Sequence, residues 1–307
     1  MAGERLRADL ALGFSTVIWG ATFVVVKDAL ADVSVLAYIA VRFGLAAAVM
    51  GVIFWRSLRR LTFRTVWAGV QIGLFMLTAY IFQTAGLKFT TPAKAAFLTG
   101  SSVVLVPILL AAFGGRRMTR WIWAGAGSAL AGLYFLTVPP EGFGGLNRGD
   151  PLVFLCAVMF ALHIIFIGRY VGHHSVGALS FLQVATTAVL AALLLPVFAV
   201  AGWEHFRLVW THTLIFAVLI TAIGSTVIGF SFQTWAQQHT SPAHTAILLS
   251  LEPVFAALTS WILAREHFGP RILAGAALIL AGILLAELKG PAPAAPESPE
   301  PVAPAAG

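Results

Sequence analysis

"FQTAGLKFTTPA" at residues 82–93 returns as "FQTWAQQHTSPA" at residues 232–243. The two copies share Phe-Gln-Thr at the start and Pro-Ala at the end, and residues 82–132 align with residues 232–282 without a gap. Similarity at a fixed offset within one chain is typical of a structural repeat. The motif therefore predicts that the chain contains two copies of one structural unit.

A second match, between "RAD" at residues 7–9 and "RGD" at residues 148–150, marks the starts of the two units. We expect a first unit over residues 7–140, a second over 148–288, and a Pro/Ala-rich tail over 289–307. The tail is too poor in large apolar residues to form a core, so we expect it to be disordered.

The composition is that of a membrane protein. Hydrophobic residues make up 59% of the 307 residues and charged residues only 10%, with a mean hydropathy of +0.91. This leaves too little polar surface for a water-soluble fold of such length. An apolar run of about 20 residues crosses the bilayer core as a helix. We expect ten such helices, at residues 10–27, 33–55, 66–87, 93–113, 120–138, 151–169, 178–200, 213–236, 243–264 and 270–288.

Five helices in each unit mean that the second unit enters the membrane from the opposite face. The expected fold is an all-α membrane protein with ten transmembrane helices arranged as two inverted-topology five-helix repeats. This plan is typical of secondary transporters, in which a site between the repeats opens first to one side and then to the other.

The net charge of +7 comes mainly from Lys and Arg at predicted helix ends. Such residues usually encode membrane orientation, so the charge gives no reason to expect a nucleic-acid partner. They are more numerous on the side of the N-terminus, which predicts that both termini are cytoplasmic. We expect a multi-pass protein of the bacterial cytoplasmic (inner) membrane.

Polar and aromatic side chains inside the predicted spans indicate a substrate site, because burying polar groups in lipid is costly. Trp19 and Thr22 share a face of the first helix, and His163 lies on the matching face of the sixth; helix packing is the alternative interpretation. Amide and hydroxyl side chains on other helices suit a small zwitterionic or amide-bearing solute. The substrate-binding candidates are Trp19, Thr22, Gln83, Thr99, Ser102, His163, Gln233 and Ser250.

Two prolines and two charged residues complete the candidate set. Pro107 and Pro253 are expected to bend the fourth and ninth helices and to free backbone carbonyls. Glu252 is costly to ionise in an apolar helix, so it is either a proton-coupling group or a structural carboxyl. Arg42 binds a substrate carboxylate, pairs structurally with Glu252, or reaches to the interface with its long side chain.

The fifth and tenth helices differ from the others. Gly125 and Gly132, and Gly275 and Gly282, recur at seven-residue spacing. Such spacing predicts close backbone packing and a scaffold role. We therefore expect the cavity to be lined by the first, third, fourth, sixth, eighth and ninth helices.

The sequence gives little support to other classes of protein. It lacks a Gly-rich nucleotide-binding loop ending in Lys-Ser/Thr, which argues against an ATP-driven motor. The eight His lack the spacing of a helical metal site, so we expect no metal, no cofactor and no catalytic residues. The expected partners are a small-molecule substrate, protons as a candidate coupling ion, and membrane lipids. A membrane-embedded lipid-modifying enzyme and a passive pore of the same fold are the alternatives.

Three segments resemble EamA-type permeases of the drug/metabolite transporter superfamily. They are "WGATFVVVKDAL" at residues 19–30, "VRFGLAAAVM" at 41–50, and above all the run over 241–285 that begins "SPAHTAILLSLEPVF". The resemblance covers residues 7–288. It implies a carrier of the cytoplasmic membrane, commonly an exporter of amino acids or other small metabolites, that works by alternating access through a cavity between two five-helix repeats.

One position departs from the family pattern, which places a Glu at the end of the fourth helix of each repeat. Glu266 matches this pattern in the second half, whereas Arg116 stands at the corresponding position of the first half. The resemblance therefore implies no shared role for that acid in this chain.

Overall fold

The computed structural model describes residues 2–20, 22–113, 118–142, 144–255, 258 and 269–289. The candidate acid Glu266, its counterpart Arg116 and the Pro/Ala-rich tail lie outside the described residues. Within the described part the regular secondary structure is helical, apart from one isolated bridge between Val33 and Leu208. The expected all-α class is confirmed.

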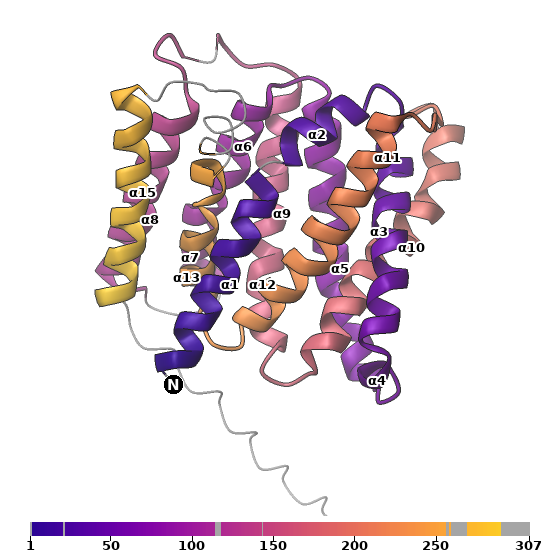
Figure 1. Ribbon diagram of the computed structural model, residues 1–307, viewed down its shortest axis with the longest axis horizontal. Coiled ribbons are helices and arrows are strands. Elements are labelled where there is room, and N and C mark those ends of the chain that lie inside the picture. Colours follow the sequence, from indigo (N-terminus) through magenta and orange to yellow (C-terminus); the bar gives the residue numbers. More distant parts are fainter. Residues whose placement is uncertain are drawn as a thin grey trace, which may run out of the picture.

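The first half of the chain runs through eight helices or helix segments in the described residues (Figure 1). They are α1 (Ala2–Gly20), α2 (Thr22–Ala29), α3 (Val35–Ile53), α4 (Trp55–Leu58), α5 (Phe63–Leu87), α6 (Pro92–Gly100), α7 (Ser102–Phe113) and α8 (Arg120–Thr137).

The second half begins with two long helices and continues through shorter elements in the described residues. Its elements are α9 (Gly149–Tyr170), α10 (Val176–Val200), α11 (His212–Leu219), the π-helix η1 (Ile220–Gly229), α12 (Phe230–Ala236), α13 (Pro242–Leu249) and α15 (Pro270–Lys289).

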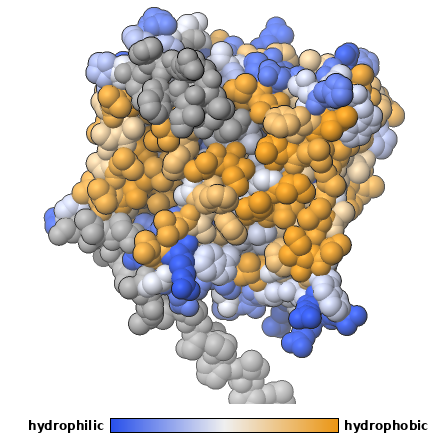
Figure 2. Space-filling view, viewed as in Figure 1, coloured by the Kyte–Doolittle hydropathy of each residue, from blue (hydrophilic) through white to orange (hydrophobic). Residues whose placement is uncertain are grey.

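Seven helical stretches of the described chain are long and apolar enough to cross a membrane. They are Gly3–Ala29, Val35–Ile53, Phe63–Leu87, Lys94–Phe113, Gly149–Tyr170, Val176–Val200 and His212–Ala236, and Pro270–Ala286 is a shorter apolar helix. Figure 2 shows the apolar side chains as a broad band, with hydrophilic residues above and below it. The structure is that of a multi-pass membrane protein. The end of the ninth expected helix, at residues 256–257 and 259–264, lies outside the described residues.

Both copies of the repeated motif begin a helix in the same way. The Thr91 hydroxyl accepts a hydrogen bond from the Lys94 backbone N–H at 3.2 Å, and the Ser241 hydroxyl accepts one from the His244 backbone N–H at 3.2 Å. A proline follows each cap at the start of the helix, where a missing N–H costs nothing. The motif is therefore a helix start that occurs twice.

The glycine stripes join α8 and α15, which lie side by side at one edge of the molecule (Figure 1). A Cβ atom on Gly125 would lie 2.7 Å from the Gly282 carbonyl oxygen, and one on Gly132 would lie 2.6 Å from the Gly275 carbonyl oxygen. Only glycine permits such an approach, so the close packing predicted from the glycine spacing is present.

A hydrophobic cluster between α3, α5 and α10 lies on the opposite side of the helical bundle from that helix pair. Phe43 and Met50 of α3, Met76 of α5 and Val184 of α10 are fully buried in it. This packing fixes the helices that carry Arg42 and Tyr80 into the cavity described next.

Candidate functional site

A cavity lies between the helices of the bundle. Its volume is about 90 Å³, and because one enclosed water needs about 10–15 Å³ it holds only a small solute in this conformation. Its walls come from α1, α2, α3, α5, α6, α7, α9, α12, and α13 with the residues just after it. The polar and aromatic lining is Trp19, Thr22, Phe23, Arg42, Tyr80, Gln83, Thr84, Thr99, Ser102, Phe160, Phe230, Gln233, Ser250 and Glu252.

The lining agrees largely with the helices expected from the sequence. No described residue of α8 or α15 lines the cavity, as expected for scaffold helices. The difference is α3, which was not among the expected lining helices and contributes Arg42.

Trp19 is held at the cavity wall by α12 and the π-helix η1. Its indole N–H donates to the Ser225 carbonyl oxygen at 2.9 Å, and its ring packs on Phe230 with centroids 5.2 Å apart. A Cβ on Gly229 would come within 2.6 Å of the indole nitrogen. Gly229 is therefore needed where Trp19 crosses the neighbouring helix.

Arg42 is a buried cation held by neutral groups. Its Nε donates to the Thr226 hydroxyl at 3.0 Å and its Nη2 to the Tyr80 hydroxyl at 3.2 Å, while the guanidinium carbon lies 4.7 Å from the Tyr80 ring centroid. Among the described residues, no carboxylate forms an ion pair with it, Glu252 included. The guanidinium therefore keeps donors for an anionic group in the cavity.

Glu252 lines the same cavity. Its carboxyl makes no hydrogen bond or ion pair with any residue that the structure describes. Pro253 beside it lacks the N–H that would bond to the Leu249 carbonyl, and α13 ends at Leu249. The end of α13 and the Glu252 carboxyl therefore face the cavity next to each other.

The hydroxyl and amide candidates differ in how much of their hydrogen-bonding capacity is left for a solute. Gln83 donates weakly to Thr99 at 3.5 Å, so both retain hydrogen-bonding capacity toward the cavity. Thr22 and Ser250 donate to the carbonyl oxygens of residues three positions earlier, at 2.7 and 2.6 Å. Their hydroxyl oxygens remain available as acceptors.

Two predicted residues lie outside the cavity lining. His163 is buried behind Phe160 and Phe230, and its Nε2 lies 2.8 Å from Oε1 of Gln183. Pro107 is buried within α7, away from the lining. Of the ten other candidates, all line the cavity.

Several lining residues were missed by the sequence reasoning. Tyr80, Thr84 and Leu87 lie on the same helical face as Gln83, so the spacing around this residue indicates them. Thr226 carries no such local signal: it is an ordinary hydroxyl residue in an apolar helix. Its role appears only because η1 forms a π-helix, a distortion that is common at functional sites.

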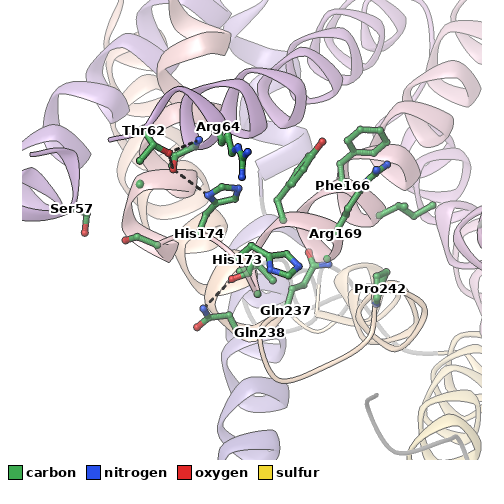
Figure 3. Close-up of a pocket in the computed structure, with 18 of the residues that line it drawn as sticks. Ser57, Thr62, Arg64, Phe166, Arg169, His173, His174, Gln237, Gln238 and Pro242 are labelled. Atoms are coloured by element: carbon green, nitrogen blue, oxygen red, sulfur yellow. Dashed lines mark hydrogen bonds between the residues drawn. The ribbon is translucent and has the colours of Figure 1, made fainter. Parts of the chain in front are cut away.

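A second, larger recess opens at the end of the molecule that carries α4 and the N-terminus (Figures 1 and 3). We call it the vestibule; its volume is about 1820 Å³. Its walls come from the α4 to α5 turn, the α9 to α10 turn and the loop before α13. Its arginine and histidine lining residues are Arg56, Arg59, Arg60, Arg64, Arg169, His173 and His174.

A thin layer separates the vestibule from the cavity. Gln233 and Ile164 line the cavity, whereas Gln237 lines the vestibule. Gln237 Nε2 donates to the Ile164 carbonyl oxygen at 2.8 Å, and Gln233 Nε2 lies 3.4 Å from Gln237 Oε1. One layer of α9 and α12 side chains thus divides the two spaces.

Two polar pairs occupy matching positions in the two copies of the motif. Lys94, two residues after Pro92, contacts Asp150 at 2.5 Å, and His244, two residues after Pro242, contacts Asp9 at 3.1 Å. The first pair lies at the starts of α6 and α9 and the second in the first part of α1 and at the start of α13, and Figure 1 shows these two sets of helix starts at opposite ends of the helical bundle. Each pair joins a residue of one half of the chain to a residue of the other half.

A polar cavity enclosed by apolar spanning helices is the architecture of a membrane transporter. The sequence profile of the EamA-like transporter family matches residues 6–138 and again residues 147–288, so the chain belongs to this family.

The comparisons with individual proteins agree. The chain is 35% identical to an uncharacterized transporter of Archaeoglobus fulgidus, over 93% of this chain and 87% of that protein. It is 26% identical to the uncharacterized transporter YyaM of Bacillus subtilis, over 90% and 91% of the two chains. A protein of known crystal structure superposes with a TM-score of 0.73 at 22% identity, over 92% of this chain and 96% of that one, which supports the fold alone. The chain is thus a multi-pass membrane transporter, a class that is generally not enzymatic.

Proposed function

We propose that this chain is a secondary transporter that exports small metabolites such as amino acids across the bacterial cytoplasmic membrane by alternating access. The central cavity carries the proposal: it gathers a cation, a carboxyl, amides and aromatic rings among apolar helices. Such groups are costly within a membrane unless they face a solute or water.

Alternating access is supported by the reciprocal contacts of the two halves. The Lys94–Asp150 and Asp9–His244 pairs occur at matching positions. We propose that residues 7–140 and 148–288 form two inverted five-helix repeats, ten spans in all, with both termini in the cytoplasm. The vestibule, lined by five arginines, then faces the cytoplasm in accordance with the positive-inside rule.

Within the cavity, Arg42 binds the carboxylate of the solute, because its charge has no carboxylate partner among the described residues. Glu252 either receives the amino group of the solute or exchanges a proton. Gln83, Thr99 and the Trp19 ring complete the solute's surroundings.

The test is uptake of a panel of radiolabelled amino acids and small metabolites into proteoliposomes, with and without an imposed proton gradient. We expect saturable transport by the intact chain that falls in Trp19→Ala, while Ser128→Ala, on the scaffold helix α8, serves as the matched control. Transport that responds to the gradient in the intact chain but not in Glu252→Gln assigns proton coupling to Glu252.

Other outcomes separate the alternatives. Flux that does not saturate and shows no counterflow exchange indicates a passive pore. Absence of transport for every solute, together with chemical change of added lipids, indicates a lipid-modifying enzyme. Either result overturns the carrier proposal.

A further inference from the structure

The vestibule is unusual in the sign of its charge. Five arginines line it, and no Asp or Glu is among the described residues that do so. Four of the five come from one short segment, residues 56–64, which includes α4 and the turn into α5. Like charges this close repel one another and destabilise the segment unless counter-charge is supplied.

Among the described residues, no carboxylate pairs with these arginines. Where the chain is described, none of the five forms an ion pair. The guanidinium carbons of Arg59 and Arg56 instead lie 4.4 and 5.6 Å from the Trp55 ring centroid, and that of Arg169 lies 5.8 Å from the Tyr170 ring centroid. Stacking on rings leaves the N–H donors of a guanidinium at its edge free for an anion.

The walls of the vestibule are fixed by hydrogen bonds, so the charges face a formed recess. Nδ1 of His174 lies 3.1 Å from the Thr65 hydroxyl, which joins the α9 to α10 turn to the start of α5 (Figure 3). Gln238 Nε2 donates to the Val171 carbonyl oxygen at 3.2 Å and so ties the loop before α13 to the same turn. These bonds fix the start of α5, which carries Arg64, relative to the α9 to α10 turn, which follows Arg169. Both arginines therefore line the same vestibule.

Large, exposed apolar side chains lie in and beside the same segment. Trp55, Phe63 and Trp67 are 45%, 84% and 57% exposed. Aromatic residues of this kind concentrate where a helix meets the headgroup layer of a membrane. In a membrane, this pattern would place the arginines of residues 56–64 near the lipid phosphates.

We propose that the vestibule binds a phosphate group, supplied by the headgroup of an anionic lipid. Guanidinium groups match phosphate oxygens with paired hydrogen bonds, and basic pockets between spanning helices are suited to anionic headgroups. Arg64 of α5 and Arg169 of the neighbouring helix α9 contact the phosphate, and the aromatic residues contact the acyl chains. Arginines that serve only as orientation signals would instead give no preference between lipids of different headgroup.

The test uses the purified full-length chain in detergent and measures its melting temperature with short-chain phosphatidylglycerol, short-chain phosphatidylcholine or inorganic phosphate added. We expect phosphatidylglycerol to raise the melting temperature by several degrees more than phosphatidylcholine does. The extra shift is expected to disappear in the double variant Arg64→Gln with Arg169→Gln. It is expected to persist in Arg7→Gln with Arg120→Gln, two exposed residues at the same end that do not line the vestibule.

Each shift is compared with the lipid-free melting temperature of the same variant, so a change in basal stability does not affect the result. Native mass spectrometry supplies a second readout: the number of phosphatidylglycerol molecules retained falls only in the vestibule variant. A shift with inorganic phosphate but not with phosphatidylglycerol keeps the phosphate site and assigns its ligand to the aqueous phase. Equal losses in the two double variants, or no difference between the lipids together with no phosphate effect, overturn the proposal.

Discussion

At the scale of single residues, Arg42 is the side chain whose substitution should affect transport most. It is a buried charge whose observed hydrogen-bond partners, Thr226 and Tyr80, are neutral. Replacement by Gln removes the charge and the paired donors, whereas replacement by Lys keeps the charge but not the planar geometry.

We expect transport by Arg42→Gln to fall about tenfold to hundredfold, the effect of losing a charge-assisted hydrogen bond of about 1.5–3 kcal/mol. Arg42→Lys should recover only part of the rate, and Thr226→Val should show a smaller loss because it only positions the guanidinium. Concentration-dependent uptake in proteoliposomes measures these effects. A rate in Arg42→Gln equal to that of the intact chain would contradict contact with the solute.

His174 gives a pH-dependent prediction at the same scale. Burial, and the charge of neighbouring His173, hold the pKa of His174 below its usual value of 6.5. As the pH falls, the unfolded chain takes up the proton first, so the stability that neutral His174 contributes is present above pH 6.5 and is lost as the pH passes through the lowered pKa of the folded state.

The melting temperature should therefore fall between about pH 7.5 and pH 5, and by less in His174→Gln, which stays neutral throughout. His212→Gln, at the exposed start of α11, is the control and should keep the full pH dependence. Identical pH dependence in His174→Gln and the intact chain would show that this imidazole contributes nothing to it.

At the scale of elements, the pairing of α8 with α15 depends on glycine at the contact. A Cβ on Gly132 would lie 2.6 Å from the Gly275 carbonyl oxygen and 2.8 Å from the Ile279 backbone nitrogen, neither of which can move aside without shifting a helix. Gly132→Ala should lower the free energy of unfolding by about 1–3 kcal/mol.

Gly127 lies on the same helix, and a Cβ there meets nothing within 4 Å. Gly127→Ala should thus leave stability unchanged or raise it slightly, because alanine favours a helix. Thermal unfolding of both variants in one detergent provides the measurement. Equal melting temperatures for the two would mean that the glycine contact does not hold the helices together.

Elements also show where sequence reasoning succeeds and where it stops. The scaffold pair was predictable because seven-residue glycine spacing is a local pattern with a direct packing consequence. Arg42 was recognisable as a buried charge, but its partner Thr226 lies 184 residues away, and nothing in the sequence around Thr226 predicts the π-helix that presents it. His163 was expected to line the cavity because its face of the sixth helix matches the face of Trp19 and Thr22 on the first, yet its ring is buried against Gln183, behind the lining.

At the scale of the whole molecule, the proposed cycle requires each end of the helical bundle to open in turn. The Lys94–Asp150 pair joins the halves at one end and the Asp9–His244 pair joins them at the other. A carrier that alternates must separate the first pair to open one face and the second pair to open the other. A bridge across either pair should therefore stop transport by itself.

The single cysteine makes this testable. In a Cys156→Ser background, cysteines are introduced at both Lys94 and Asp150, or at both Asp9 and His244. Each cysteine pair is then bridged by a short bifunctional thiol reagent that a reductant cleaves. We expect transport to stop on bridging either pair and to return on reduction. The control pair has cysteines at both Ser128 and Leu278. The Ser128 hydroxyl donates to the Leu278 carbonyl oxygen at 2.7 Å across α8 and α15, and these two helices need not separate in the cycle. Continued transport with one end bridged would contradict alternating access, because a carrier that turns over with that end closed does not depend on opening both faces.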